Sequence, residues 1–547
     1  MPLSRREFLI DSLASGFVLA GGKDQRTQSG YPFQHGVASG DPLSDAIIIW
    51  TRLTPSGQPG GLAYRWVIAT DRGLNNIVAE GSGYTSAERD YTAKHDVRGL
   101  APGHAYFYAF YCMGHWSDTG RFRTLPDGHV DRIRLAFTSC SNYAAGYFNV
   151  YRELAGRSDL DVILHLGDYI YEYANIEESL SSGRINEPLQ ETVSLADYRA
   201  RHACYKADKD SQAVHRSHAF IAIWDDHEVA NNAWQGGAKN HSDQQGDWSV
   251  RLNAAVQAYY EWMPVREISH TGRLALYRGY RFGDLLDLSV LDTRLAGRDE
   301  PASLPHQTQM EERTLLGMEQ EQWLEGRLME AQQQGITWKL LGQQVMMAQL
   351  GLADQPLNYD QWDGYPAARR RIFDCLRKHQ ISNFGVLTGD IHSSWAMTLH
   401  EDPFASTDHP LGFELVTPAV TSPGITNQTA AMVAASSLSQ VMPHLEFVDF
   451  YYRGFVLLDI THETLQAEWW AVNRVDSPRY TVSCLKALKV ARDTCDFIES
   501  VPVSLEGEGT PMAEFSDDLA YLRNWTPSGG TPDGMSIKER IAAWYSP

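Results

Sequence analysis

The chain has 547 residues, of which 43% are hydrophobic, and a formal net charge of -21 at pH 7. That length exceeds what one hydrophobic core usually organises, so we expect two domains. The negative charge argues against a broad nucleic-acid or anionic-membrane surface, because such surfaces need clustered Lys and Arg. A phosphate site in this chain would have to supply its own positive charge, for example from bound metal ions.

The first residues are typical of an export signal. Arg5 and Arg6 stand directly before an apolar run at residues 8–20, which is too short to span a membrane. The alternative is a poorly ordered N-terminus with a chance arginine pair. Because the pair, the apolar run and the position agree, we predict a twin-arginine signal peptide at residues 1–24. The twin-arginine export machinery would then be a partner, the protein would be periplasmic or secreted, and no transmembrane segment is expected.

Residues 30–126 have the pattern of an all-β domain. Apolar and aromatic runs at 46–50, 63–68 and 106–111 are separated by Gly, Pro and Asp turns at strand-like intervals. A small β-sandwich fits this spacing. The turn residues Pro126-Asp127-Gly128 then predict a hinge.

From residue 130 to residue 505, short apolar runs alternate with helical patterns, as in α/β proteins. The strand candidates are residues 133–138, 162–166, 220–224, 285–291, 338–341 and 384–387. Helices are predicted at 148–154, at 367–378 and where Leu324, Leu328 and Ala331 share one face. The tail at 506–547 is rich in turn residues and ends in a predicted short helix at 537–544.

Six cysteines in so long a chain do not indicate a disulfide scaffold. Cys484 and Cys495 could close a small loop in an oxidising compartment. A chance spacing explains the pair equally well, so the sequence leaves both alternatives open.

Polar residues follow four of the predicted strands directly. These segments are Ser139-Cys140-Ser141-Asn142, Gly167-Asp168-Tyr169-Ile170-Tyr171-Glu172, Asp225-Asp226-His227-Glu228 and Thr388-Gly389-Asp390-Ile391-His392. In α/β sheets, ligands bind at the carboxyl ends of the strands. We therefore expect these four segments to converge on one site.

Asp168 is the strongest single candidate, because a carboxylate at a tight strand exit can bridge two cations. Its alternative role is a helix N-cap, which Asp also favours. Tyr171 could bind a strongly acidic ion such as Fe(III) as a phenolate, although packed core tyrosines are commoner. Cys140 is likewise more often a small buried hydrophobe than a ligand.

The acidic segment at Asp225 and Asp226 is harder to explain as ordinary structure. Adjacent buried carboxylates repel each other unless a cation or hydrogen bonds compensate. The neighbouring His227 could donate a proton to a leaving group or hold a phosphoryl oxygen. The alternative, a solvated acidic turn, conflicts with the apolar strand before it. Asp390 and His392 stand two apart, which in extended chain points both side chains the same way.

With these motifs, the chain resembles the PhoD-like alkaline phosphatase and phosphodiesterase family over nearly its whole length. The motifs that carry the resemblance are His35-Gly36-Val37-Ala38-Ser39-Gly40-Asp41-Pro42, Ser139-Cys140-Ser141, His165-Leu166-Gly167-Asp168-Tyr169-Ile170-Tyr171-Glu172, Trp224-Asp225-Asp226-His227-Glu228, Leu291-Asp292-Thr293-Arg294 and Thr388-Gly389-Asp390-Ile391-His392-Ser393-Ser394-Trp395.

The resemblance implies an α/β fold, an αββα calcineurin-like metallophosphoesterase sandwich at 130–505, preceded by an N-terminal Ig-like β-sandwich. It also implies a centre of Fe(3+) and Ca(2+). The implied metal ligands are Cys140 and Tyr171 on iron, Asp168 bridging iron and calcium, Asp226 and Asp390 on calcium, and His392 at the metals. The implied catalytic residues are His227 on the phosphoryl group or leaving oxygen, with Asp225, Asn232 and Arg294 nearby. Gln344 is a further candidate ligand or supporting group.

The implied activity is that of an exported alkaline phosphatase or phosphodiesterase, which hydrolyses phosphate mono- or diesters with a metal-bound hydroxide. One departure concerns substrate preference: where the family usually has a His-Gly-Tyr run, this chain reads Arg453-Gly454-Phe455.

The alternative enzyme is a phospholipase D-like phosphodiesterase, which no obvious exposed amphipathic stretch supports. The alternative from another class is a non-catalytic exported binding protein, which degraded motifs would favour.

Overall fold

The computed structural model describes residues 31–56, 60–267, 269–270, 273–350, 357–405 and 409–503. The predicted signal peptide at 1–24 and the predicted helix at 537–544 lie outside these residues. Among the helices that are described, none has the length and apolar character needed to cross a membrane. All six cysteines are free, so Cys484 and Cys495 form no disulfide.

The N-terminal part is all-β, as its turn spacing predicts. Its strands are β1 (Val37–Gly40), β2 (Ala46–Arg52), β3 (Leu62–Ala69), β4 (Ile77–Thr85), β5 (Thr92–Arg98), β6 (Ala105–Cys112), β7 (His115–Trp116) and β8 (Gly120–Arg123). Strands β3, β4, β6, β7 and β8 form an antiparallel sheet of their own. An apolar core that includes Ile49, Trp66 and Tyr108 fills the space between this sheet and β1, β2 and β5.

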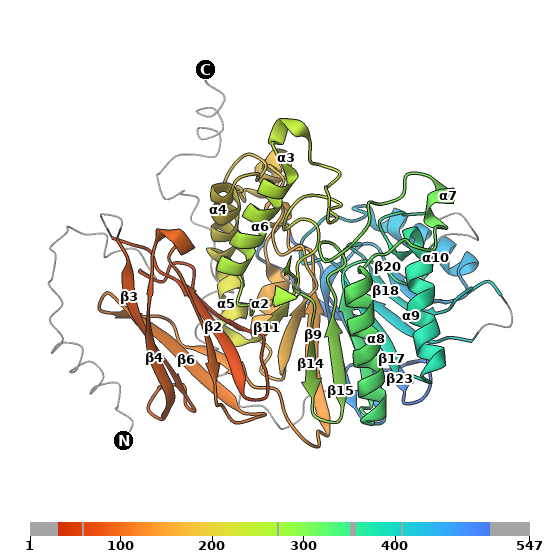
Figure 1. Cartoon of the computed structure of the whole chain (residues 1–547), viewed down its shortest axis with the longest axis horizontal. Helices are drawn as coiled ribbons and strands as arrows, with labels where there is room; N and C mark the ends of the chain where they lie inside the picture. The colour runs from red at the N-terminus through yellow and green to blue at the C-terminus, as the bar shows by residue number, and fades with distance from the viewer. Residues whose placement is uncertain are drawn as a thin grey trace.

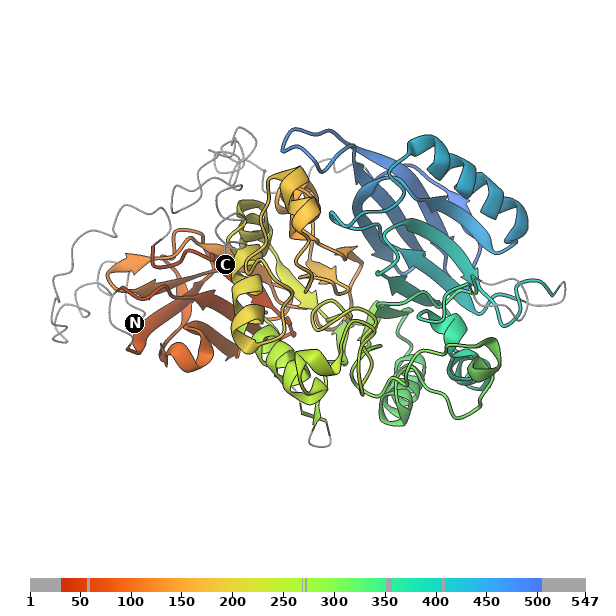
Figure 2. The same ribbon diagram turned by 90° about the horizontal axis from the view of Figure 1, so that it is seen from above.

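Strands β1, β2 and β5 also belong to a second, much larger sheet. Its order is β24-β23-β22-β21-β9-β10-β11-β1-β2-β5. The added strands are β9 (Arg132–Thr138), β10 (Val162–His165), β11 (Ala219–Ala222), β21 (Arg453–Thr461), β22 (Thr464–Val472), β23 (Val482–Ala491) and β24 (Phe497–Glu499). The junction is a parallel pairing in which Ser39 lies opposite Ala219. Figure 2 shows the N-terminal strands at one end of the molecule and the C-terminal strands at the other.

A seven-stranded sheet has the order β14-β15-β16-β17-β19-β18-β20. Its strands are β14 (Arg278–Phe282), β15 (Leu286–Val290), β16 (Trp338–Gln343), β17 (Phe384–Thr388), β18 (Ser394–Leu399), β19 (Gly412–Val416) and β20 (Leu445–Asp449). Strands β15, β16, β17 and β19 run parallel. A separate hairpin consists of β12 (Ser269–His270) and β13 (Arg273–Leu274).

Helices lie outside both sheets (Figure 1). They are α2 (Asn149–Ala155), α3 (Ile176–Ser182), α4 (Leu195–Lys206), α5 (Lys209–Ser217), α6 (Trp248–Trp262), α7 (Pro305–Thr308), α8 (Met318–Gln333), α9 (Pro366–Lys378) and α10 (Gln428–Val441). As predicted, α8 buries Leu324, Leu328 and Ala331 on one face. Two of these side chains pack with Ile372 of α9 in the core on the outer side of the seven-stranded sheet.

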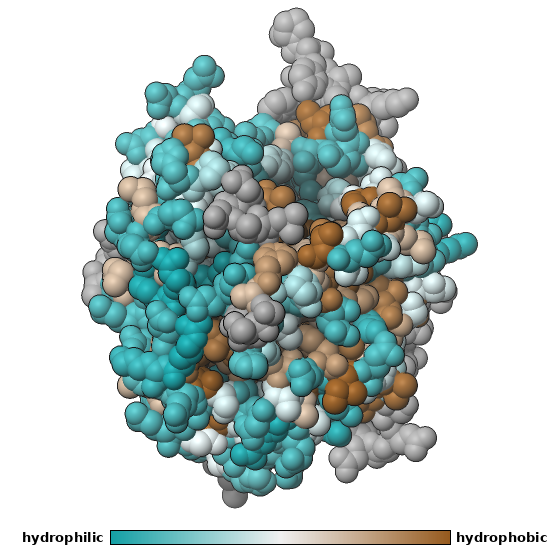
Figure 3. Space-filling view, turned by 90° about the vertical axis from the view of Figure 1, so that its right-hand side faces the viewer, coloured by the Kyte–Doolittle hydropathy of each residue, from teal (hydrophilic) through white to brown (hydrophobic). Residues whose placement is uncertain are grey.

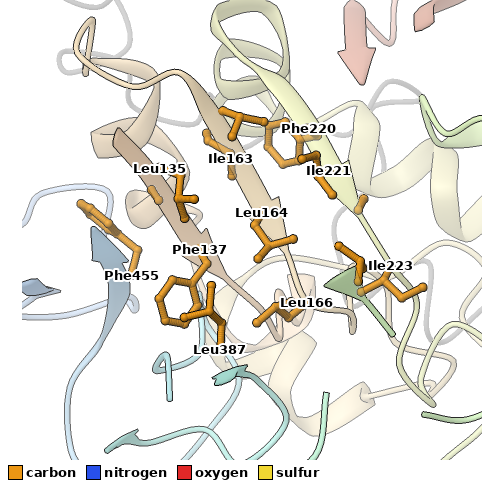
Figure 4. Packing of buried hydrophobic residues seen from close by; sticks show 14 of the residues in the cluster. Leu135, Phe137, Ile163, Leu164, Leu166, Phe220, Ile221, Ile223, Leu387 and Phe455 are labelled. Atoms are coloured by element: carbon orange, nitrogen blue, oxygen red, sulfur yellow. The ribbon is translucent and has the colours of Figure 1, made fainter. Parts of the chain in front are cut away.

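The two large sheets pack face to face through apolar side chains. Leu135 and Phe137 of β9, Leu164 of β10 and Leu387 of β17 belong to one continuous core (Figure 4). The backbone at Gly342 lies close to side chains of the facing sheet, since a Cβ there would meet Leu164 Cδ2 at 3.1 Å. Strands buried on both faces read as nearly continuous apolar runs, which is why the sequence pattern identifies β10 and β11 well and β9 despite its Arg134.

The outer surface is mostly hydrophilic, but not uniformly so. Figure 3 shows the right-hand side of the molecule, where apolar residues gather in patches among polar ones. Helix α10 has no charged residue and exposes Met432, Val433 and Val441. Helix α10 therefore contributes one of these apolar patches, while other exposed hydrophobic residues are spread along the chain.

All six strands predicted in the α/β region exist, with ends that differ from the predicted ones by one or two residues. Helices α3, α4, α5, α6, α7 and α10 and most strands after residue 390 were not predicted from the sequence. It also did not foresee that the N-terminal region shares a sheet with the α/β region, because that pairing joins β1 to a strand far along the chain. Periodicity reports local structure and carries no information about such long-range pairing.

Candidate active site

The predicted site residues lie on loops at the carboxyl ends of the central strands. Cys140 follows β9, Asp168 follows β10, and Asp390 and His392 follow β17. All four have a positive φ, between 54° and 61°, as does Asn232 with 52°. Left-handed backbone at a residue other than Gly costs about 1 kcal/mol or more and clusters at functional sites. Other residues of the chain share this conformation, but its recurrence at these strand ends agrees with a functional site there.

One group of donors combines a thiol, a phenol, a carboxylate and an imidazole. Single ligand atoms of Cys140, Asp168 and His392 all lie within 4.8 Å of one another. The Tyr171 hydroxyl donates to Asp168 Oδ2 at 2.9 Å and lies 3.2 Å from His392 Nε2. Ser422 Oγ donates to the same hydroxyl at 2.7 Å. The structure thus brings together four residues that the sequence analysis selected from three separate strand ends.

The His392 ring is held in one orientation by the backbone. Its Nδ1 lies 2.9 Å from the carbonyl oxygen of Pro423, and a carbonyl can only accept. Nδ1 therefore carries the proton, and in the neutral ring Nε2 keeps its lone pair toward the site. Burial lowers the pKa of His392 to about 4, which favours this neutral form.

A second group of donors is almost purely acidic. Asp168, Asp226 and His227 have ligand atoms within 4.8 Å of one another, and so do Asp225, Asp226 and Asp390. Asp168 thus belongs to the mixed group and to the acidic one. In the described part of the chain, Asp225 Oδ2 and Asp226 Oδ1 are buried and accept no hydrogen bond. Buried carboxylate oxygens rarely lack partners, so these two atoms require an explanation.

A single arginine supplies most of the local positive charge. The guanidinium of Arg294 is fully buried and donates to Asp225, to Asp360 at 2.7 Å and to Asp390 at 3.0 Å. It also lies 3.8 Å from Asp226 Oδ1. Arg294 is therefore at the site, as predicted, but its donors contact carboxylates.

The pKa values of these carboxyl groups diverge. Burial raises the pKa of Asp225 well above its ordinary value, although the Arg294 charge opposes the shift. Burial raises the pKa of Asp168 similarly, with His227 opposing. For Asp226 the effect of burial is outweighed by Arg294, His227 and the Asn232 N–H, so its pKa is lowered. Such divergence among neighbouring acids is a recurrent feature of active sites.

His227 is fixed by a buried carboxylate and an aromatic ring. Its Nδ1 lies 2.7 Å from Glu172 Oε2, and its ring stacks on Tyr171 with centroids 4.3 Å apart. Burial lowers the pKa of His227, but Glu172, Asp226 and Asp168 together raise it well above its ordinary value. His227 is therefore held rigidly beside the acidic group.

Glu228 connects the two central loops. Its carboxylate accepts from the backbone N–H groups of Tyr169 at 2.6 Å, Asp225 at 2.8 Å and Asp168 at 3.1 Å. The sequence analysis quoted Glu228 within a motif but gave it no role. Its contacts make it the residue that holds the loops after β10 and β11 together.

An open pocket of about 400 Å³ adjoins the acidic group. Asn232 and Asp360 form its inner side, and Trp234, Lys239 and Tyr359 are among its other lining residues. The backbone N–H of Asn232 donates to Asp226 Oδ2 at 2.5 Å, which ties the pocket to the site. A bound molecule could reach the acidic group from here.

The chain is similar to known proteins over most of its length. A family model described as PhoD-like phosphatase matches residues 135–469, and one described as PhoD-like phosphatase, N-terminal domain, matches residues 19–126. The chain belongs to the PhoD-like phosphatase family. It is similar to alkaline phosphatase D of Bacillus subtilis (strain 168), with 33% identity over 91% of this chain and 87% of that protein.

The fold agrees with that family. A solved structure described as the structure of PhoD superposes with a TM-score of 0.79 and 32% identity, over 90% of this chain and 98% of that one. As the sequence analysis predicted, the protein is a phosphoric ester hydrolase with mixed α/β sheets. The predicted alternative of a non-catalytic binding protein is therefore not supported.

Arg453 is the residue at which the sequence was expected to depart from the family pattern. The guanidinium is mostly buried and donates to the carbonyl oxygens of Tyr452 at 2.8 Å, Tyr451 at 3.2 Å and His392 at 3.4 Å. Its observed contacts are therefore with backbone around the His392 loop.

Gln344 does not reach the carboxylates directly, but it supports the loop that carries Arg294. Its amide oxygen accepts from the Thr293 backbone N–H at 3.0 Å, and its Nε2 donates to the Leu291 carbonyl. Two further residues were missed: Asp360 and Gln361 contact Arg294 and Asp390, but they lie far along the loop after β16 and do not follow a strand end directly. No local pattern marks them, and only the fold brings them to the site.

Proposed function

We propose that this hydrolase cleaves phosphate esters at the strand-end site with two bound cations, an iron(III) and a calcium. Asp168 would bridge them, because it alone belongs to both the mixed and the acidic donor groups. The observation that carries the proposal is the dense buried acid that shares one arginine, in which Asp225 Oδ2 and Asp226 Oδ1 accept no hydrogen bond from the described residues. A cation is the simplest way to satisfy such atoms.

The donors suit those two ions. Cys140, Tyr171 and His392 offer sulfur, phenolic oxygen and imidazole, which suit a transition metal such as iron. Burial, with Asp168 adding to its effect, raises the pKa of Cys140 and of Tyr171 well above the ordinary values, and a bound cation would reverse that by deprotonating them. Asp226 and Asp390 offer only oxygen, which calcium prefers.

The chain's own residues would orient the substrate. Bound cations would activate a water molecule and neutralise negative charge on the phosphate. His227, held by Glu172, would contact a phosphoryl oxygen or protonate the leaving oxygen. Asp225 would hold Arg294 in place, and Asn232 would contact the phosphate from the mouth of the pocket.

The adjoining pocket would bind the organic part of the ester. Trp234 and Tyr359 provide aromatic surface there, and Lys239 provides a positive charge. A second substituent on phosphorus would fit this space, which favours diesters as substrates alongside monoesters. Arg453 would affect that preference through the His392 loop that it contacts.

Several predictions of the sequence analysis remain proposals of ours. They are twin-arginine export to the periplasm or medium, the calcineurin-like description of the packed sheets, the Ig-like description of the N-terminal domain, and the domain limits at 30–126, 130–505 and 506–547. The two family-model matches, at 19–126 and 135–469, support that division.

The test combines metal analysis with two chromogenic esters. We expect about one iron and at least one calcium per chain, visible absorbance from an iron–phenolate pair, and turnover of both p-nitrophenyl phosphate and bis-p-nitrophenyl phosphate. A colourless, fully active enzyme without iron would contradict the iron assignment. Preference for phospholipid vesicles over both esters would instead favour the phospholipase alternative. Arg453→His should shift the ratio of the two activities without changing metal content.

A further inference from the structure

A second cluster of potential metal ligands lies at the edge of the sheets opposite the active site. Strand β9 runs from Arg132, at this edge, to Thr138, next to the candidate metal ligands. At about 3.3 Å per residue its seven residues separate the two edges by roughly 20 Å. Residues at this edge therefore cannot belong to the active site.

Three segments that are distant in sequence meet here. His129 directly follows the predicted hinge residues Pro126-Asp127-Gly128, in the connection between β8 and β9. Asp284 belongs to the turn between β14 and β15, and His462 to the turn between β21 and β22. Single ligand atoms of the three residues lie within 4.8 Å of one another. The imidazole rings are nearly parallel, with centroids 5.1 Å apart. The cluster therefore links the hinge, the seven-stranded sheet and the ten-stranded sheet.

The His462 ring can present a lone pair to this cluster in one of its two neutral tautomers. Its Nδ1 lies 2.6 Å from Thr337 Oγ1, and in the tautomer whose Nδ1–H donates to that hydroxyl, Nε2 is an acceptor. Within the described residues Nε2 is shielded from solvent and has no hydrogen bond. It lies 3.5 Å from Asp284 Oδ1. That is too long for a good hydrogen bond, but two ligands of a tetrahedral zinc ion lie roughly 3.4 Å apart.

His129 completes the arrangement with its own supporting carboxylate. Its Nδ1 lies 2.8 Å from Asp284 Oδ2, and its Nε2 lies 3.3 Å from Asp131 Oδ1. Metal-binding histidines usually donate their second N–H to an oxygen, as Nε2 of His129 and Nδ1 of His462 would do in a metal-bound cluster. Metal binding would release the Nδ1 proton of His129 to solvent and replace the 2.8 Å hydrogen bond.

We propose that His129, Asp284 and His462 bind a divalent transition metal of the zinc class, with water as the fourth ligand. Two imidazoles and one carboxylate form a donor set that zinc favours. The ion would fasten the hinge to both sheets, and its role would be structural. This inference uses none of the proposed active-site residues, so it stands or falls independently of the proposed function.

Zinc stoichiometry provides the direct test. Full-length protein carrying its native metals would be dialysed against zinc at pH 8, and bound zinc would be counted for wild type, for Asp284→Asn and for the double variant His129→Ala with His462→Ala. His306→Ala, at an exposed position on α7, is the matched control. We expect wild type and His306→Ala to bind one more zinc per chain than the other two. Equal zinc in all four proteins would overturn the proposal and leave the cluster as an ion pair.

The unfolding temperature gives a second measurement that does not depend on counting. A ligand that binds only the folded state raises the unfolding midpoint as its concentration increases. We expect zinc to raise the midpoint of wild type more than that of Asp284→Asn, which keeps the size of the side chain. Both proteins should hydrolyse p-nitrophenyl phosphate equally, because the cluster is remote from the active site. An identical zinc-induced rise in both would count against the site.

Discussion

Asp41 and Asp225 both stand at the ends of buried strands in the ten-stranded sheet, and both are shielded from solvent, yet their surroundings differ. Asp41 Oδ1 accepts from Arg278 at 2.8 Å and from the Tyr280 hydroxyl at 2.6 Å. Asp41 Oδ2 accepts from the Arg266 backbone N–H at 2.6 Å. Every oxygen of Asp41 is therefore satisfied by the chain itself.

The acidic group around Asp225 is not satisfied in that way. Arg294 is shared among Asp225, Asp360 and Asp390, and one oxygen of Asp225 and one of Asp226 accept no hydrogen bond within the described structure. A buried charge without compensation is costly, so a chain that keeps several of them must compensate them with something else. The comparison separates a structural aspartate, whose oxygens the chain satisfies, from an acidic group that we propose to be completed by cations.

Replacing Asp168 should remove a shared metal ligand from the acidic group, and we expect it to have the largest effect on metal content and activity. We expect Asp168→Asn to lose most of its bound metal and to lower kcat/KM by about a thousandfold or more, which corresponds to ~4 kcal/mol of transition-state stabilisation. Metal analysis and p-nitrophenyl phosphate kinetics measure the two effects together. Unchanged activity in a variant with normal metal content would remove Asp168 from the site.

The same substitution at Asp41 should affect stability instead of chemistry. Asp41→Asn would leave the buried Arg278 guanidinium without its carboxylate, which typically costs about 3–5 kcal/mol. We expect a clearly lower unfolding temperature, with metal content and kcat retained in the folded fraction. If Asp41→Asn instead lost metal at an unchanged unfolding temperature, the distinction drawn here would be wrong.

The sequence predicted most of the site because the site follows the strands. Cys140, Asp168, Asp225 and Asp390 each come directly after an apolar run, and the ends of parallel strands meet at one edge. Asp360 escaped prediction because it lies far along the loop after β16 and not directly at the end of that strand. The N-terminal region was correctly predicted as all-β, but its pairing with β11 depends on a contact between strands far apart in sequence.

Glu172 offers a smaller test, at a residue that acts through His227. Glu172→Gln would keep the size of the side chain but weaken the bond at 2.7 Å from His227 Nδ1. We expect kcat to fall by about 10- to 100-fold, the usual effect of removing a group that orients an active-site residue, with KM little changed. Glu191→Gln, which alters the partly exposed partner of Arg251, is the matched control and should leave kcat unchanged. A change in KM alone would indicate that Glu172 shapes the substrate pocket.

The smallest effect is expected from replacing His202, and it concerns the free energy of unfolding at acidic pH. The ring is fully buried, lies parallel to Trp262, and has no hydrogen bond at either nitrogen within the described residues. Burial lowers its pKa to about 3, below the ordinary 6.5. Between those pH values the unfolded chain binds a proton at His202 that the folded chain does not bind. The free energy of unfolding is therefore unaffected by protonation of His202 above pH 6.5 and decreases as the pH falls toward 3.

His202→Phe would remove that titrating group while keeping a ring against Trp262. We expect the decline of unfolding free energy between pH 6.5 and 4 to be shallower than in wild type by at most ~1.4 kcal/mol per pH unit. His306→Phe, at an exposed position, should not alter the slope. Urea unfolding across that pH range measures it. Parallel curves for His202→Phe and wild type would mean that the His202 ring is already protonated in the folded state, and therefore that its surroundings are more polar than its burial indicates.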